Sequence, residues 1–203
     1  MSSYIGNMAS FGELVLVLGD LNIPHRASVI PPQFKKMLVP GKISHVICTG
    51  NLCTQEQLDY LHSICPNVHA VKGDFDEISD LPETKVVTVG SFRIGVCHGH
   101  QIVPWGDDES LALLQRKLDV DILITGHTHK ITTKEYGQRW FINPGSITGA
   151  FSPGSPAGTR PTFILMAING PKVVNFVYEL QTDKESGEQT VGVEKVEMVK
   201  AEN

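Results

Sequence analysis

The chain has 203 residues, of which 41% are hydrophobic, and a formal net charge of −5 at pH 7. This length and composition allow one domain with a substantial core. No apolar run approaches the roughly 20 residues that a membrane span needs, so the sequence argues against membrane insertion. Residues 179–203 carry seven acidic and three basic side chains, which leaves the rest of the chain close to neutral. Because the sequence has no basic stripe, we do not expect it to bind nucleic acid through charge.

The N-terminal segment, MSSYIGNMASFG, has neither the basic region nor the continuous apolar region of a secretory signal. We interpret residues 1–12 as a flexible extension and residues 13–203 as a single domain that ends in an acidic strand or tail. The cysteines Cys48, Cys53, Cys65 and Cys97 form no CxxC pair. This spacing favours reduced thiols in a cytoplasmic protein over disulfides or a zinc–thiolate site.

The first part of the chain alternates strands and helices. Strands are expected at 12–20, 45–51 and 68–74, and helices at 31–38 and 54–64, the second with Thr54 as its N-cap. This order is typical of a parallel sheet, whose functional side chains gather at the carboxyl ends of its strands.

The second part of the chain is richer in strands. Residues 85–99 predict two strands around a Gly-Ser turn, and 107–118 predict an amphipathic helix with acids in its first turn and bases in its last. A buried strand at 120–130 is followed by further strands within 131–146, 162–181 and 190–200, with a loop rich in Pro, Gly and Ser at 151–161. We therefore expect an α/β fold in which two packed mixed β-sheets are flanked by helices, a four-layer αββα sandwich.

Polar side chains follow five of the predicted strands. A single aspartate after a strand is usually a turn former, and a single histidine on an apolar face is usually a core residue. Five such clusters at successive strand ends would meet at one edge of a sheet, and their mixture of imidazole, carboxylate and amide suits Zn²⁺, Mn²⁺ or Fe. The clusters are Asp20 with Asn22, Asn51, Asp74, His98 with His100, and His127 with His129.

These residues resemble the metallophosphoesterase superfamily, whose pattern runs D-x-H, G-D, G-N-H-D/E, H and G-H-x-H. The corresponding segments here are DLN (20–22), GN (50–51), GDFD (73–76), H (98) and GHTH (126–129). The resemblance implies a pair of metal ions that clamp a phosphate and activate water. The metal ligands that it implies are Asp20, Asn22, Asn51, Asp74, His98, His127 and His129.

Four positions depart from the superfamily pattern. Asn22 stands where a histidine ligand is expected, and Asn51 and Asp74 exchange the usual aspartate and asparagine. These changes predict weak or partial occupancy by Zn²⁺ or Mn²⁺. Phe75 stands in the slot of the histidine thought to protonate the leaving oxygen, and loss of a general acid typically costs about 10²–10⁴-fold in rate. We therefore expect no catalytic residue, with His100 and Asp76 left as alternative acids.

A narrower resemblance extends over nearly all of residues 13–180. The segments LVLGDLNIPHRA, FKKMLVPGKISHVICTGNLCT, HGHQIVPWGD and INPGSITGAF are similar to the small-subunit family of retromer, the endosomal sorting complex. The resemblance implies a non-catalytic scaffold in endosome-to-Golgi retrograde transport, cytoplasmic and peripheral to endosome membranes. It also implies a helical-solenoid retromer subunit as partner and a second apolar patch for regulators of small GTPases.

Two groups of apolar residues are candidates for these surfaces. One is the loop at 101–107, which must fold back into the core or meet a partner. The other combines a residue of the helix expected at 31–38 with residues of two strands. Alternation predicts that one face of each strand is buried, but it does not tell which face. The partner-binding candidates are Ile102, Val103, Pro104 and Trp105 in the loop, and Met37, Leu165, Phe176 and Tyr178 in the second group.

Two other functions remain open at the level of sequence. The first is a metal-dependent phosphodiesterase or phosphatase with a rearranged site. The second is a sensor that binds a small molecule or nucleotide in a vestigial cleft. The interaction subunit is favoured by Phe75, Asn51 and Asn22. These residues replace a proton donor and metal ligands of the superfamily pattern, while the rest of the pattern is kept.

Overall fold

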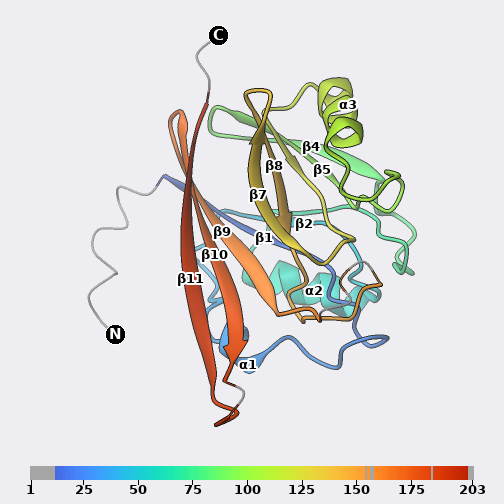
Figure 1. The fold of residues 1–203 in the computed structure, drawn as a ribbon, viewed down its shortest axis with the longest axis vertical. Coiled ribbons are helices and arrows are strands. Elements are labelled where there is room, and N and C mark those ends of the chain that lie inside the picture. The colour runs from blue at the N-terminus through green and yellow to red at the C-terminus, as the bar shows by residue number, and fades with distance from the viewer. Residues whose placement is uncertain (1–11, 154, 156–157, 184, 201–203) are drawn as a thin grey trace.

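A computed structural model describes residues 12–153, 155, 158–183 and 185–200. The described chain folds into two mixed β-sheets packed face to face, with helices on the outside (Figure 1). Residues 1–11 of the expected N-terminal extension and residues 201–203 of the acidic tail lie outside the described residues.

The first sheet has six strands in the order β11-β10-β9-β1-β2-β3. β1 pairs in parallel with β2, and β2 with β3, whereas β9, β10 and β11 run antiparallel to their neighbours. The parallel half corresponds to the alternating first part of the sequence. The bounds are β1 (Glu13–Leu18), β2 (His45–Cys48), β3 (Val68–Ala70), β9 (Thr162–Asn169), β10 (Lys172–Thr182) and β11 (Gln189–Val199).

The second sheet has five strands in the order β4-β5-β6-β8-β7. β5, β6 and β8 are parallel, and β4 and β7 form the antiparallel edges. Its parallel centre places the ends of β5 and β6 beside the ends of β1 and β2 in the first sheet. The bounds are β4 (Thr84–Val89), β5 (Phe92–Cys97), β6 (Ile122–Ile124), β7 (Ile131–Tyr136) and β8 (Arg139–Pro144).

Three helices, α1 (Pro32–Lys35), α2 (Gln55–Ile64) and α3 (Asp108–Leu118), flank the sheets. The expected helix at 31–38 was too long, because α1 has only four residues and the chain then turns. Pro40 disfavours the helical conformation for the residue before it, which limits any extension. At α3, the Asp107 carboxylate accepts a hydrogen bond from Ser110 N at 2.9 Å and caps the helix. Thr54 occupies the N-cap position of α2, but its side chain makes no capping hydrogen bond.

Alternation along β1 explains the layered core. Val15 and Val17 belong to the cluster between the two sheets, whereas Leu16 and Leu18 belong to the cluster that includes Phe34 of α1 and residues of α2. Because both faces of β1 are covered, its sequence is apolar at successive positions. A third cluster joins α3 to the outer face of the second sheet. The four-layer prediction is therefore confirmed.

Among the described residues, no helix has the length and apolar character required to cross a bilayer.

Candidate metal centre

The polar clusters converge because the parallel strands end at the same side of the molecule. Hydrogen bonds between the loops continue the pairing beyond the strands: Asp20 N donates to Gly50 O at 3.0 Å, and Gly126 N donates to His98 O at 2.8 Å. The strands are shorter than expected at this end, so the functional side chains project from loops. The strand expected at 120–130 was too long, because β6 ends at Ile124 and His127 and His129 lie in the loop after it.

The backbone of these loops adopts a conformation that is unfavourable for most side chains. Eight non-glycine residues in the described part of the chain have positive φ, a region that L-residues other than Asn and Asp rarely occupy. Such conformations persist where surrounding contacts impose them, and they concentrate at functional sites. Six of the eight lie in the loops of the candidate centre: Asp20, Asn22, Asn51, Cys53, His127 and His129.

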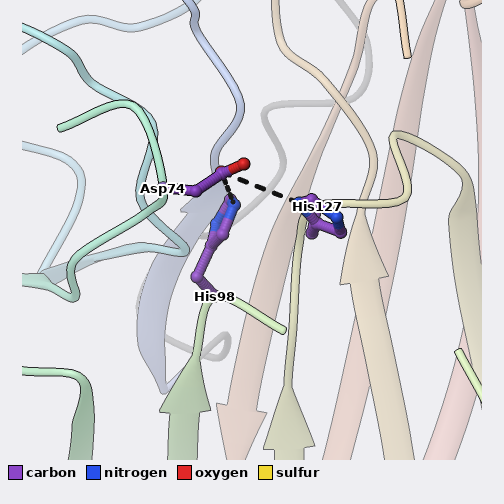
Figure 2. Close-up of side chains that lie close together, drawn as sticks. All are labelled: Asp74, His98 and His127. Atoms are coloured by element: carbon purple, nitrogen blue, oxygen red, sulfur yellow. Dashed lines mark hydrogen bonds and ion pairs between the residues drawn. The ribbon is translucent and has the colours of Figure 1, made fainter. Parts of the chain in front are cut away.

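Asp74, His98 and His127 form the most compact group of metal-ligand side chains. The Asp74 carboxylate lies between the two imidazoles, as Figure 2 shows. Its Oδ1 is 3.0 Å from His98 Nε2 and 3.7 Å from His127 Nδ1. One ligand atom from each residue lies within 4.8 Å of the others. One carboxylate and two imidazoles are a donor set that suits Zn²⁺ or Mn²⁺.

Asp20 and His129 form a second, more buried group. Asp20 Oδ1 is 3.3 Å from His129 Nε2, while Asp20 Oδ2 accepts a hydrogen bond from His127 N at 2.9 Å. His98 Nε2 lies 3.9 Å from Asp20 Oδ1, so His98 stands between the two carboxylates. The two groups are therefore adjacent, as two neighbouring metal positions would be.

Asn51 connects the two groups through its amide. Its Nδ2 donates to Asp20 Oδ1 at 3.3 Å and to Asp74 Oδ1 at 3.0 Å, while its Oδ1 accepts a hydrogen bond from Phe75 N at 2.9 Å. The amide nitrogen thus faces both carboxylates. For Asn51 to offer its oxygen to an ion, the amide must turn over and lose the bond to Phe75 N, a cost that a bridging aspartate would not carry.

Two histidines are held by backbone carbonyls in the orientation that metal ligands need. His98 Nδ1 donates to Thr49 O and His129 Nδ1 donates to Ala150 O, both at 2.7 Å. These bonds place the lone pair on Nε2 when the ring is neutral, which is the outer-sphere support typical of metal-binding histidines.

The charges of the centre stabilise one another. Burial by itself would raise the pKa of Asp20, but the hydrogen bond from His129 and the charges of His98 and His129 hold the pKa below its usual range. Burial likewise opposes ionisation of Asp74, but its hydrogen bonds with His127 and His98 lower its pKa below the usual range. Both aspartates are therefore carboxylates, the form that binds a cation.

Asn22 makes the group around Asp20 and His129 a poorer metal site than the group around Asp74. Its side chain is fully buried, and neither Oδ1 nor Nδ2 has a hydrogen-bond partner in the described structure. An ion bound through Oδ1 would satisfy the oxygen but would leave Nδ2 without a partner, whereas an imidazole would offer a nitrogen lone pair. The residues therefore fit an ion at Asp74, His98 and His127 better than one at Asp20, Asn22 and His129.

Phe75 follows Asp74 in the loop after β3, and its side chain is 39% exposed. The guanidinium carbon of Arg26 stands 4.4 Å from the centre of its ring, a cation–π contact. Arg26 also donates to the backbone oxygen of Phe151, whose side chain is exposed. Arg26 was not among the residues predicted from the sequence, although it lies in the segment LVLGDLNIPHRA.

Asp76 holds two of the loops together. Its Oδ2 accepts hydrogen bonds from Asn51 N and Gly73 N at 2.9 and 2.7 Å, and its Oδ1 accepts from Cys53 N at 2.7 Å. Both oxygens are occupied as acceptors, so the proposal of Asp76 as an alternative acid gains no support. The other alternative, His100, has its pKa lowered by burial and by the nearby His98.

The loop at 101–107 divides its apolar side chains between core and surface. Ile102 packs against the cluster that joins α3 to the second sheet. Val103 is 74% exposed, Pro104 is exposed and Trp105 is 52% exposed. The Trp105 ring makes an edge contact with His127, 4.4 Å between centroids, so the exposed part of the loop adjoins the metal-ligand group.

The second group of candidates lies on the outer face of the first sheet. Leu165 on β9 pairs with Phe176 on β10, and Tyr178 pairs with Phe163, with its ring stacked on that of Phe163 at 4.7 Å. All three predicted strand residues are partly buried. Met37 follows α1, which covers part of the same face through Phe34, and is 37% exposed.

The matched family model is the calcineurin-like phosphoesterase superfamily domain, which covers residues 13–170. Vacuolar protein sorting-associated protein 29 of Schizosaccharomyces pombe is 41% identical over 170 residues, which are 82% of this chain and 91% of the relative.

Solved structures of Vps29 proteins have the same fold as this chain. Vps29 of Chaetomium thermophilum is 43% identical, with a TM-score of 0.88 over 95% of this chain and all of the other, and it has also been solved with a RaPID-derived cyclic peptide. Wild-type Vps29 of Entamoeba histolytica, solved with Zn²⁺, is 50% identical, with a TM-score of 0.82 over 91% of this chain and 98% of the other. The chain belongs to the Vps29 family of vacuolar protein sorting proteins, within the calcineurin-like phosphoesterase superfamily.

Proposed function

We propose that this protein acts by docking, with the face of its metal-binding loops against a helical-solenoid subunit of retromer. Membership of the Vps29 family makes the chain a non-catalytic retromer subunit with a phosphoesterase-like fold. The observation that carries the docking proposal is Phe75, an exposed benzyl group beside the metal ligands where the superfamily pattern has a proton donor.

Catalysis is disfavoured by what surrounds the ligands. Phe75 has no proton to transfer, Asp76 accepts three backbone hydrogen bonds, and Asn51 presents its amide nitrogen to the carboxylates. The loop face is instead apolar and exposed, with Val103, Trp105 and Phe75 available for contact. Apolar side chains of this size at a surface are typical of a protein interface.

We assign the metal role to one strong position and one weak one. Asp74, His98 and His127 would hold Zn²⁺ or Mn²⁺, and Asp20, Asn22, Asn51 and His129 would hold a second ion weakly or in part of the molecules. A bound cation would neutralise the paired carboxylates and fix the loops that carry the docking surface.

The outer face around Leu165, Phe176, Tyr178 and Met37 is the proposed site for regulators of small GTPases. It lies on the side of the first sheet that α1 and α2 flank, away from the second sheet. A solenoid partner and a regulator could therefore bind at the same time. Retromer membership also leads us to propose a location peripheral to endosome membranes, in the cytoplasm.

The docking proposal is tested by Val103→Asp. Val103 is 74% exposed, so a charge there should leave the melting temperature nearly unchanged while it weakens binding to the solenoid subunit by 100-fold or more, on the order of a hot-spot loss. Calorimetric titration of the purified partners measures the effect. Val199→Asp, at an exposed position on β11, is the matched control and should bind normally. Unaltered binding by Val103→Asp would remove the loop from the interface.

The absence of catalysis is tested with a generic aryl phosphodiester in excess Mn²⁺ or Zn²⁺. We expect no hydrolysis above the background rate of the metal alone. Turnover at ordinary enzyme rates, about 1 s⁻¹ or more, that disappears in His127→Ala would establish the phosphodiesterase alternative in place of the scaffold.

A further inference from the structure

A group of titratable side chains lies at the end of the first sheet away from the metal-binding loops. Glu13 opens β1, His45 opens β2 and His69 is the central residue of β3. His45 and Asn51 are six residues apart, a separation of roughly 15–20 Å along a strand and its following turn. This group is therefore separate from the centre formed by Asp74, His98 and His127.

The two imidazoles face each other through their nitrogens. His45 Nδ1 is 3.2 Å from His69 Nε2, and the rings are inclined by 27° with their centres 5.4 Å apart. Two nitrogen ligands on one tetrahedral Zn²⁺, each at about 2.0–2.1 Å, are about 3.3 Å apart. The two nitrogens thus already stand at the separation of a chelating pair.

Glu13 fixes the orientation of His45. Its Oε2 is 3.2 Å from His45 Nε2, and its Oε1 accepts a hydrogen bond from Gly90 N at 3.1 Å, in the turn between β4 and β5. A carboxylate can only accept here, so a neutral His45 carries its proton on Nε2 and keeps its lone pair on Nδ1. A carboxylate behind a histidine in this way is the usual support of a metal-ligating imidazole.

We propose that His45 Nδ1 and His69 Nε2 form a second cation site, which binds a divalent d-block ion such as Zn²⁺ or Cu²⁺ with water completing the coordination. Imidazole nitrogen is the ligand that these ions prefer among neutral side chains. Both histidines are partly exposed, which gives the water ligands access.

The proton balance of binding is simple. In the ion-free pair, the Nε2–H group of His69 donates a hydrogen bond to His45 Nδ1. On binding, that proton leaves Nε2 and the neutral ring carries its proton on Nδ1, so both lone pairs reach the ion. Burial, together with Lys85 and His45, lowers the pKa of His69 to about 4, so its ring is neutral at pH 7.

The bound ion would join the amino ends of β2 and β3, and Glu13 would connect it to the second sheet through Gly90. Because the native chain would bind the ion and the unfolded chain would not hold the two rings together, the ion would raise the melting temperature.

The experiment uses the full chain with Asp74→Ala, which removes the carboxylate shared by the loop histidines. Equilibrium dialysis against ZnCl₂ with elemental analysis gives the number of ions bound. We expect His69→Gln and His45→Gln, each added to this background, to lower that number by one and to remove part of the Zn²⁺-induced rise in melting temperature. His62→Gln, at an exposed histidine of α2, is the matched control and should change neither.

A second measurement uses the chain without substitutions. Substoichiometric Cu²⁺ should broaden the backbone amide NMR signals of residues 45 and 69 as well as those of the loop histidines. Broadening confined to the loops, or an unchanged Zn²⁺ count in both glutamine variants, would overturn the second site. Neither measurement depends on partner binding or hydrolysis, so the proposed scaffold function is tested separately.

Discussion

At the scale of single residues, most candidate ligands of the centre have hydrogen-bond partners that orient them, whereas the side chain of Asn22 has none in the described structure. His98 and His129 each have a backbone carbonyl behind the ring, and Asp74 has two imidazoles beside its carboxylate. Within the described part of the chain, the side-chain amide of Asn22 has no hydrogen-bond partner, and it lacks the nitrogen lone pair of the expected histidine. A single side chain therefore accounts for the proposed inequality of the two metal positions.

Asn22→His should strengthen the weaker position. An imidazole nitrogen is a better donor to Zn²⁺ or Mn²⁺ than an amide oxygen, and the substitution removes a buried amide without partners. We expect occupancy of the loop centre near one ion or less in the native chain and an increase in Asn22→His, both counted by elemental analysis in a His69→Gln background. Two tight loop ions in the unsubstituted Asn22 chain would contradict the assignment.

At the scale of elements, short strands and long loops produce the centre. β2 and β3 end at Cys48 and Ala70, well before Asn51 and Asp74. The loops that follow are joined by Asp76, whose carboxylate accepts backbone hydrogen bonds from both of them. Their geometry therefore depends on this one side chain as well as on the strands.

Asp76→Ala should lower the free energy of unfolding by about 2–4 kcal/mol, because three backbone donors lose a charged acceptor. It should also reduce metal occupancy, since Asn51 and Asp74 lie in the two loops that Asp76 joins. Urea denaturation followed by circular dichroism measures the first effect and elemental analysis the second. Glu77→Ala, at the exposed neighbouring position, should change neither. Equal stability of the two variants would show that the loops hold their geometry without the carboxylate.

At the scale of the whole molecule, the core between the sheets keeps the two halves of the centre together. Asp20, Asn51 and Asp74 follow strands of the first sheet, whereas His98 and His127 follow strands of the second. The cluster between the sheets includes Val15 and Val17 of β1 and Ile94 of β5, all fully buried. Packing between the sheets is thus a condition for the candidate metal centre.

Ile94→Ala should destabilise the fold by about 2–5 kcal/mol, the range for large-to-small substitutions in a core. Leu113→Ala, at a position 61% exposed on α3, should change stability by no more than about 0.5 kcal/mol. Urea denaturation curves of both variants test the difference. Similar losses in the two variants would contradict the assignment of Ile94 to the central core.

The order of strands and helices and the four layers followed from the sequence, and so did the convergence of the candidate ligands Asp74, His98 and His127. These features depend on local patterning, since apolar runs mark buried strands and polar residues mark their ends. The same patterning failed for the end of the helix expected at 31–38 and for the strand expected to carry His127 and His129. α1 ends at Lys35 and β6 ends at Ile124, because local patterning does not fix where regular backbone hydrogen bonding stops.

Motif order alone also predicted the candidate metal-ligand residues and the place of Phe75 beside them, because residue types and spacing are written in the chain. The hydrogen-bond partners of these side chains were decided only by the tertiary structure. It determines that the Asn51 amide oxygen accepts from Phe75 N and that the side chain of Asn22 has no partner in the described structure. It also brings three backbone donors to Asp76 and places His45 beside His69. Hydrogen bonds and chelation act over about 3 Å, and contacts at that distance between residues far apart in the chain exist only once both sheets have packed.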